Sequence, residues 1–173
     1  MQRTAMRELA FKLVYEIEVQ KENSEEQIQI FLENNEITDE KVVNYLKDVV
    51  NGLEKNNTEI DELISKNLKE NWSLSRISKI TLSLLKLAIY EMVYVKIPYK
   101  VAINEVVELA KKYADDAAPT FVNGVLASVV KEKLLDKDEV AKEIYKIYKD
   151  KNIESGSLIR IDYEGGLCIK VLE

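Results

Sequence analysis

The chain has 173 residues, of which 46% are hydrophobic and 32% are charged, and its net charge is −6 at pH 7. It contains no His, which removes the commonest general base and metal ligand, and its single cysteine, Cys168, excludes an intrachain disulfide. An acidic chain gives no global sign of nucleic-acid binding, so an RNA site would have to be a local basic patch. No apolar run reaches the roughly 18 residues that span a bilayer, and the first residues lack the apolar core of a signal peptide, so we expect a cytoplasmic protein.

Only 5 Gly and 2 Pro interrupt the chain, which favours long helices and an all-α fold. Residues 4–20 are expected to form an amphipathic helix, because their apolar side chains recur at three- and four-residue steps. Those side chains are Met6, Leu9, Ala10, Leu13, Val14 and Ile17. Arg3, Arg7 and Lys12 fall outside this apolar stripe, so we expect them to be free for a partner.

Three further helices are expected before residue 70. Ser24 and Gln27 have the spacing of a capping box, which predicts a helix start at Ser24. A third helix is expected from about residue 38, with Asp39 and Glu40 in its first turn, where the helix dipole favours acids. A fourth is expected to begin near Thr58.

Residues 77–95 are apolar on nearly every side, which predicts a helix at the centre of the fold. Pro98 ends that helix, and a new amphipathic helix follows it. Pro119 suits the first turn of the next helix. Gly124 lies inside that helix and costs roughly 1 kcal/mol relative to Ala, so we expect close packing or a ligand to explain it.

The chain changes character after residue 135. Residues 136–150 predict a charged helix, and residues 158–172 alternate around Glu164-Gly165-Gly166-Leu167, which predicts a β-hairpin with a two-residue turn. Because an isolated hairpin is marginally stable in water, we expect this extension to dock on the body or on a second copy.

Four blocks between residues 72 and 126 resemble the NusB family in their order and spacing. They are 72–77 (WSLSRI), 97–105 (IPYKVAINE), 108–113 (ELAKKY) and 121–126 (FVNGVL). Residues 7–10 (RELA) and 14–15 (VY) are similar to the family's arginine-rich opening helix. The resemblance covers residues 1–135 and implies two packed three-helix bundles, about 1–70 and 72–135. It leaves 136–173 as a C-terminal extension of a helix and a short β-hairpin.

The resemblance also implies a function. It implies a transcription antitermination factor that binds the boxA element of ribosomal RNA leaders as single-stranded RNA. The implied partners are the ribosomal protein NusE and the RNA polymerase elongation complex. It implies no cofactor, no metal and no catalytic residue, and a homodimer stays open.

Two groups of residues are expected to contact RNA. Arg3, Arg7, Lys12 and Tyr15 lie on the first helix, where cations can track a phosphate backbone and an aromatic ring can stack on a base. The alternative is a solvated cationic face with Tyr15 partly in the core. The second group begins the last helix, where free N–H groups could hold a phosphate and Phe121 could stack on a base. Its members are Phe121, Asn123 and Gly124, with a core Phe, a helix-end Asn and a packing Gly as the alternative.

The NusE contact is expected at the central helix and its entry, through Arg76, Lys79 and Glu91. A second polar cluster follows Pro98, where helix capping is sufficient reason for polar side chains. That cluster contains Tyr99, Lys100, Asn104 and Glu105.

Two other functions compete with RNA-dependent antitermination. An RNA methyltransferase whose N-terminal domain shares this fold would need a glycine-rich cofactor domain, and the 38 residues after Leu135 are too few for one. Cys168 also has no activating base in view, so we expect a protein that is not an enzyme. The other alternative is a helical protein-binding adaptor with little RNA affinity of its own.

Overall fold

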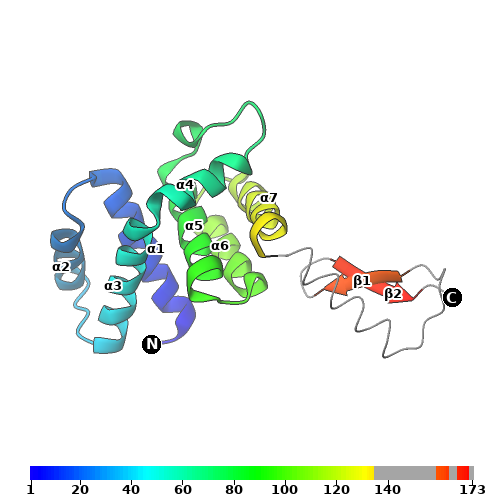
Figure 1. The fold of residues 1–173 in the computed structure, drawn as a ribbon. Coiled ribbons are helices and arrows are strands. Elements are labelled where there is room, and N and C mark those ends of the chain that lie inside the picture. The colour runs from blue at the N-terminus through cyan, green and yellow to red at the C-terminus, as the bar shows by residue number, and fades with distance from the viewer. Residues whose placement is uncertain (135–158, 164–166, 172–173) are drawn as a thin grey trace. The chain divides into compact units, whose positions relative to one another are not determined.

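A computed structural model describes residues 1–134, 159–163 and 167–171 (Figure 1). The chain divides into two compact units, Met1–Val129 and Val130–Glu173. The helix predicted over residues 136–150 lies outside the described residues, as does the turn at 164–166.

The first unit consists of helices, which confirms the all-α prediction. Its elements are α1 (Arg3–Gln20), α2 (Ser24–Asn34), α3 (Glu40–Lys55), α4 (Asn57–Lys66), η1 (Leu74–Arg76), α5 (Lys79–Ile89), η2 (Tyr90–Val95), α6 (Tyr99–Tyr113) and α7 (Ala118–Val129). The second unit begins with a short helical segment, η3 (Val130–Leu134).

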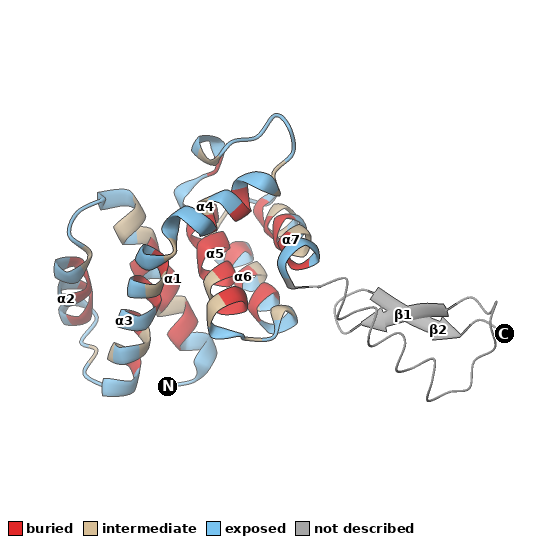
Figure 2. Ribbon diagram, viewed as in Figure 1, coloured by how far each residue is buried: buried red, intermediate tan, exposed pale blue. Residues whose placement is uncertain are grey.

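Helix α5 lies at the centre of the first unit, as predicted (Figure 1). It packs against α1, α6 and α7 and also touches α3 and α4. Every residue from 81 to 89 is buried, including the polar Thr81, Ser83 and Lys86 (Figure 2). Each helix around α5 buries one apolar stripe, either against α5 or against a helix next to α5. The hydrophobic core therefore extends through the whole first unit.

Asparagine and aspartate side chains cap the early helices. The Asn23 side chain accepts a hydrogen bond from the backbone N–H of Glu25 at 3.0 Å, and Asp39 accepts one from Lys41 at 2.9 Å. The capping box predicted at Ser24 is therefore wrong, because Asn23 is the N-cap. The Gln27 side chain donates instead to the Gln20 side chain at 2.7 Å, which joins α2 to the end of α1.

The apolar pattern predicted one helix that continues to residue 95. The structure differs, because the central helix is not a regular α-helix over that whole length. It ends at Ile89 and changes into the six-residue π-helical segment η2. Lys96 then adopts a left-handed conformation with φ of 65°, and the N–H of Ile97 donates to the carbonyl of Glu91 at 2.9 Å. Single π-helical turns are frequent at functional sites, and this one sets the positions of Tyr90 and Glu91.

Two antiparallel strands, β1 (Ile159–Tyr163) and β2 (Leu167–Val171), confirm the predicted hairpin. Tyr163 pairs with Leu167, so three residues connect the strands and the predicted two-residue turn is wrong. The longer connection shifts the register by one residue, which makes Asp162 the partner of Cys168.

Candidate nucleic-acid interface

The last turn of α6 brings Tyr113 against α1, where one carboxylate and two lysines surround its ring. Glu8 accepts hydrogen bonds from the Lys112 Nζ at 2.6 Å and from the Tyr113 hydroxyl. The Lys12 Nζ lies 5.8 Å and the Lys112 Nζ 5.2 Å from the centroid of the Tyr113 ring, within the range of cation–π interactions. We call Glu8, Lys12, Lys112 and Tyr113 the Tyr113 cluster.

The Tyr113 cluster carries one net positive charge at neutral pH. Hydrogen bonds from Lys112 and from Tyr113 lower the pKa of Glu8 below its ordinary value, so its carboxyl is ionised. The hydrogen bond to Glu8 in turn raises the pKa of Lys112. Both lysines are exposed beside an aromatic ring. Exposed cations beside a flat ring are the combination that holds single-stranded nucleic acid.

Tyr15 extends the aromatic row on the same side of α1. The Phe11 ring is buried, with its centroid 5.3 Å from the Tyr113 ring and 6.5 Å from the Tyr15 ring. Tyr15 is half-buried, so it packs on the core with one part of its ring and leaves another part in solvent. This placement is compatible with both readings of Tyr15 that the sequence left open.

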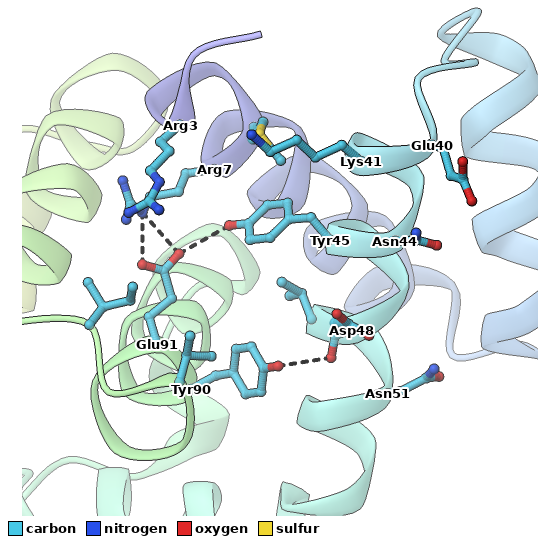
Figure 3. Close-up of a pocket in the computed structure, with 14 residues that line it drawn as sticks. Arg3, Arg7, Glu40, Lys41, Asn44, Tyr45, Asp48, Asn51, Tyr90 and Glu91 are labelled. Carbon is cyan, nitrogen blue, oxygen red and sulfur yellow. Dashed lines mark hydrogen bonds and ion pairs between the residues drawn. The ribbon is translucent and has the colours of Figure 1, made fainter.

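Arg7 is buried, so the prediction that its side chain is free for a partner is wrong. Its exposed fraction is 6%, and its Nε donates to both carboxylate oxygens of Glu91, at 3.0 and 2.8 Å. The Tyr45 hydroxyl donates to the same carboxylate at 3.1 Å (Figure 3). We call Arg7, Tyr45 and Glu91 the buried triad.

The helical position of Arg7 explains its burial. It precedes Ala10 and Phe11 by three and four residues, so it lies on the face that α1 buries. Burial disfavours the arginine charge, but the hydrogen bond and the attraction of Glu91 outweigh it, so the pKa of Arg7 is raised. Burial, followed by the charge of Glu91, raises the pKa of Tyr45 and keeps it a neutral donor. A carboxylate supplied by η2 therefore compensates the cation on the buried face.

The buried triad forms part of the wall of a groove of about 820 Å³ between α1, α3 and η2 (Figure 3). Glu91 is only 3% exposed, so the prediction that it is an exposed contact for NusE is wrong. Arg3 also lines the groove, and it is exposed, as predicted. Of the two arginines on α1, Arg3 is the one whose guanidinium a partner can reach.

The N-terminus of α7 is capped by an acid. The Asp115 carboxylate accepts hydrogen bonds from the backbone N–H groups of Ala117 and Ala118, at 3.1 and 3.0 Å. The N–H of Phe121 is already bonded to the carbonyl of Ala117 at 3.2 Å. The prediction that free N–H groups at this helix start would hold a phosphate is therefore wrong, because Asp115 brings a negative charge to them.

Phe121, Asn123 and Gly124 lie further into α7 on accessible positions. Phe121 is half-buried, whereas Asn123 and Gly124 are exposed. A Cβ added to Gly124 would have no described heavy atom within 4 Å, so packing does not explain this glycine. The other reason expected for Gly124, a ligand, stays a prediction.

The other two residues predicted to contact NusE lie at the entry to α5. Arg76 ends η1, and its guanidinium carbon lies 5.8 Å from the centroid of the Trp72 ring. Lys79 is the first residue of α5, and its Nζ lies 3.9 Å from Glu18 Oε2 at a half-exposed position. Both side chains reach the surface, and the NusE contact itself stays a prediction.

A protein-family model described as the NusB family matches residues 4–131. The chain belongs to the NusB family. It is 50% identical over 139 residues to the transcription antitermination protein NusB of Acetivibrio thermocellus, covering 80% of this chain and 94% of that protein. It is 44% identical over 133 residues to the NusB of Clostridium novyi, covering 76% of this chain and 99% of that one.

Solved NusB structures share the fold. The structure of T. maritima NusB matches with a TM-score of 0.71 at 36% identity and covers 77% of this chain and 93% of its own. A structure of the antitermination factors NusB and NusE in complex with dsRNA matches with a TM-score of 0.69 at 30% identity, covering 75% of this chain and 96% of that chain. None of the helices that the structure describes combines the length and the apolar character needed to cross a bilayer.

Sequence reasoning missed four residues of this NusB surface. Lys112 and Glu8 were not singled out, although their positions on α6 and α1 are polar and exposed or half-exposed. Trp72 and Tyr113 were used only to identify the family, as parts of the blocks 72–77 and 108–113. An aromatic residue preceded by two lysines, as in Lys111-Lys112-Tyr113, was the available signal for the cluster.

Proposed function

We propose that this protein is a transcription antitermination factor that binds RNA together with NusE. Relatives at 50% and 44% identity are NusB antitermination proteins, and a relative at 30% identity was solved with NusE and dsRNA. The observation on this chain that carries the proposal is the Tyr113 cluster. It places two exposed lysines against one aromatic ring on a protein whose net charge is −6.

The proposed RNA surface contains eight exposed or half-buried residues of α1, α6 and α7. They are Arg3, Lys12, Tyr15, Lys112, Tyr113, Phe121, Asn123 and Gly124. Arg7 is left out of the direct contacts because Glu91 occupies its Nε. We propose that Arg7 instead fixes the position of α1, so that Arg3 and Lys12 are held at the surface.

The finer proposal is a boxA-type element in the leader of ribosomal RNA operons, read as unpaired nucleotides. Aromatic side chains such as Tyr15 and Phe121 stack on bases only where the bases are unpaired. NusE and the RNA polymerase elongation complex complete the proposed assembly. A homodimer of the free protein stays a prediction, which sedimentation of the purified chain tests.

A mixing experiment tests the proposal. The full chain, NusE and a labelled boxA RNA are combined and separated by size-exclusion chromatography. We expect one peak that contains all three, with single-stranded RNA competing better than the matched duplex. Elution of the RNA alone, with the chain and NusE together, would contradict RNA binding.

That contradictory outcome would instead support a helical adaptor that binds protein only. One observation favours this alternative. Arg7 is paired with Glu91 and Lys112 is paired with Glu8, and these ion pairs lower the cationic charge available to phosphate. The two functions differ in whether NusE binding continues without RNA binding.

A further inference from the structure

Trp72 exposes much of its indole ring on the surface of the first unit. It is the single tryptophan of the chain, it lies between α4 and η1, and 46% of it is exposed. A solvent-exposed indole forgoes the free energy that burial of so large an apolar side chain provides. A single exposed aromatic residue is common on protein surfaces and does not by itself indicate a binding site. The groups around Trp72 therefore decide whether it belongs to one.

Two side chains hold Trp72 from different parts of the fold. The Phe121 ring of α7 lies 5.4 Å from the Trp72 ring, between centroids, at an interplanar angle of 38°. The Arg76 guanidinium carbon lies 5.8 Å from the Trp72 centroid, and its Nη1 donates to the carbonyl of Asn71 at 2.5 Å. These contacts restrain the ring from two directions. We call Trp72, Arg76 and Phe121 the Trp72 platform.

No acid among the described residues neutralises the positive charge of the Trp72 platform. Within the described part of the chain, no carboxylate forms an ion pair with Arg76, whereas Lys79 in the next helix pairs with Glu18. The bond from Arg76 to the Asn71 carbonyl uses one of the five N–H donors of a guanidinium. The remaining donors and the charge are available to an anionic partner.

One turn further along α7, the surface beside Phe121 is open. Gly124 follows Phe121 by three residues and therefore lies on the same face of the helix. An exposed glycine inside a helix lowers helix stability, and no described atom lies within 4 Å of the Cβ it lacks. The neighbouring Asn123 is exposed, and its amide offers both a donor and an acceptor. Glycine here allows a ligand to approach the backbone closely.

We infer that Trp72, restrained by Arg76 and Phe121, stacks on an unpaired base of the bound RNA, while Arg76 pairs with an adjoining phosphate. A flat ring fits the face of any base, a guanidinium fits a phosphate, and an amide can reach a base edge. This places Arg76 on the RNA rather than on NusE, where the sequence alone had predicted it. The inference rests on the proposed function and adds a stacking site to it.

The single tryptophan makes the inference directly measurable in the full chain. Emission from Trp72 is followed during titration with boxA RNA and, separately, with polyphosphate, which has the charge but no bases. RNA affinity is measured in parallel by anisotropy of labelled RNA, with and without NusE. The variants are Trp72→Ala, Trp72→Phe and Arg76→Gln, with Ile30→Ala as the matched control because Ile30 is 49% exposed on α2. Subtraction of the Trp72→Phe signal removes any emission from NusE.

We expect RNA to quench Trp72 emission and polyphosphate to leave it unchanged. Trp72→Ala should weaken RNA binding roughly tenfold, Trp72→Phe should retain most of the affinity, and Ile30→Ala should change nothing. The quenching is measured on the wild-type protein, so this test does not depend on whether the variants fold.

Three other outcomes would overturn the inference. If RNA binds while Trp72 emission and the affinity of Trp72→Ala stay unchanged, the stacking site is wrong and the proposed function stands. If Trp72→Ala weakens NusE binding but not RNA binding, the Trp72 platform is a protein contact. If the wild-type chain with NusE binds no RNA at all, the proposed function fails and the stacking site fails with it.

Discussion

The Nε of Arg7 lies 3.0 and 2.8 Å from the two carboxylate oxygens of Glu91, although the two residues are 84 positions apart in the chain. Both side chains are buried, so this ion pair joins α1 to η2 inside the protein. Tyr45 adds a bond from α3 to the same carboxylate. The position of α1 therefore depends on an acid supplied by a π-helical turn.

Glu91→Gln should lower the free energy of unfolding by about 3–5 kcal/mol, because it leaves the Arg7 cation buried without a counter-charge. Urea denaturation at neutral pH measures the change. Glu108→Gln is the matched control, since the Glu108 side chain is 69% exposed and pairs with Lys111 at the surface. The control should lose no more than about 1 kcal/mol. Equal losses in the two variants would contradict the stabilising role of the buried triad.

Arg7→Glu should destabilise the fold as well, because it places a second carboxylate beside Glu91. A sequence-based view of Arg7 as a free surface cation instead predicts loss of RNA binding without unfolding. Thermal melting of Arg7→Glu separates the two views. A melting temperature equal to that of the wild-type protein would show that Arg7 is not needed for the packing of α1.

Much of the fold could be predicted from apolar periodicity, because burial of one helix face is a local property of the sequence. The stretch that is apolar on nearly every side became the central helix α5, and the stripe of α1 gave its buried Met6, Ala10 and Leu13. Periodicity does not report pairings between distant polar residues. Arg7 was expected at the surface because it falls outside the apolar stripe of residues 4–20. Its partner Glu91 lies on a π-helical turn that the apolar pattern did not reveal.

The two glycines inside helices should respond oppositely to alanine. A Cβ on Gly52 would lie 2.1 Å from Cε2 of Tyr90, so Gly52→Ala must displace that ring and its hydrogen bond to the Asp48 carbonyl. We expect a loss of about 1–3 kcal/mol for Gly52→Ala. Gly124→Ala meets open space and should gain about 0.5–1 kcal/mol. Urea unfolding of the two variants, side by side, tests the pair.

RNA affinity should show whether Gly124 serves RNA binding, although glycine lowers the stability of the helix at this position. If a ligand approaches the backbone at Gly124, the more stable Gly124→Ala should bind RNA more weakly. Anisotropy titration with NusE present measures the affinity. A variant that is more stable and binds RNA as tightly as the wild type would remove Gly124 from the interface.

Lys12→Ala and Lys112→Ala should each weaken RNA binding and reduce its salt dependence. Each lysine that neutralises a phosphate contributes about 0.7 to the slope of log affinity against log salt for single-stranded nucleic acid. The measurement is a titration at several salt concentrations. Lys47→Ala, at an exposed lysine of α3, is the control and should keep the wild-type slope. Unchanged slopes for both variants of the Tyr113 cluster would place the RNA elsewhere.

Glu8 should contribute stability that depends on pH. Hydrogen bonds from Lys112 and Tyr113 lower its folded-state pKa below the ordinary 4.5, so the contribution is complete above that value and is lost as the pH falls through the folded pKa. The difference in unfolding free energy between wild type and Glu8→Gln should therefore shrink as the pH falls below 4.5. NMR titration of the Glu8 carboxyl gives the pKa directly, and a midpoint at or above the ordinary value would contradict the bonding seen here.

The candidate site was less predictable than the fold. Lys12 and Arg3 were placed correctly at the surface, because they lie beside the apolar stripe of α1. The cap at Asp115 was missed, since a helix start alone does not show which group already satisfies its N–H donors. The Trp72 platform depends on a contact between residues 72 and 121, which sequence spacing does not report.

RNA affinity of the full chain, with and without NusE, at about 50 mM and about 200 mM salt is the decisive measurement. We predict binding of boxA RNA in the presence of NusE at the lower salt concentration, with a steep loss of affinity at the higher one. Failure to bind leader RNA at low salt with NusE present, or an affinity that salt does not change, would contradict a cationic RNA surface on this protein.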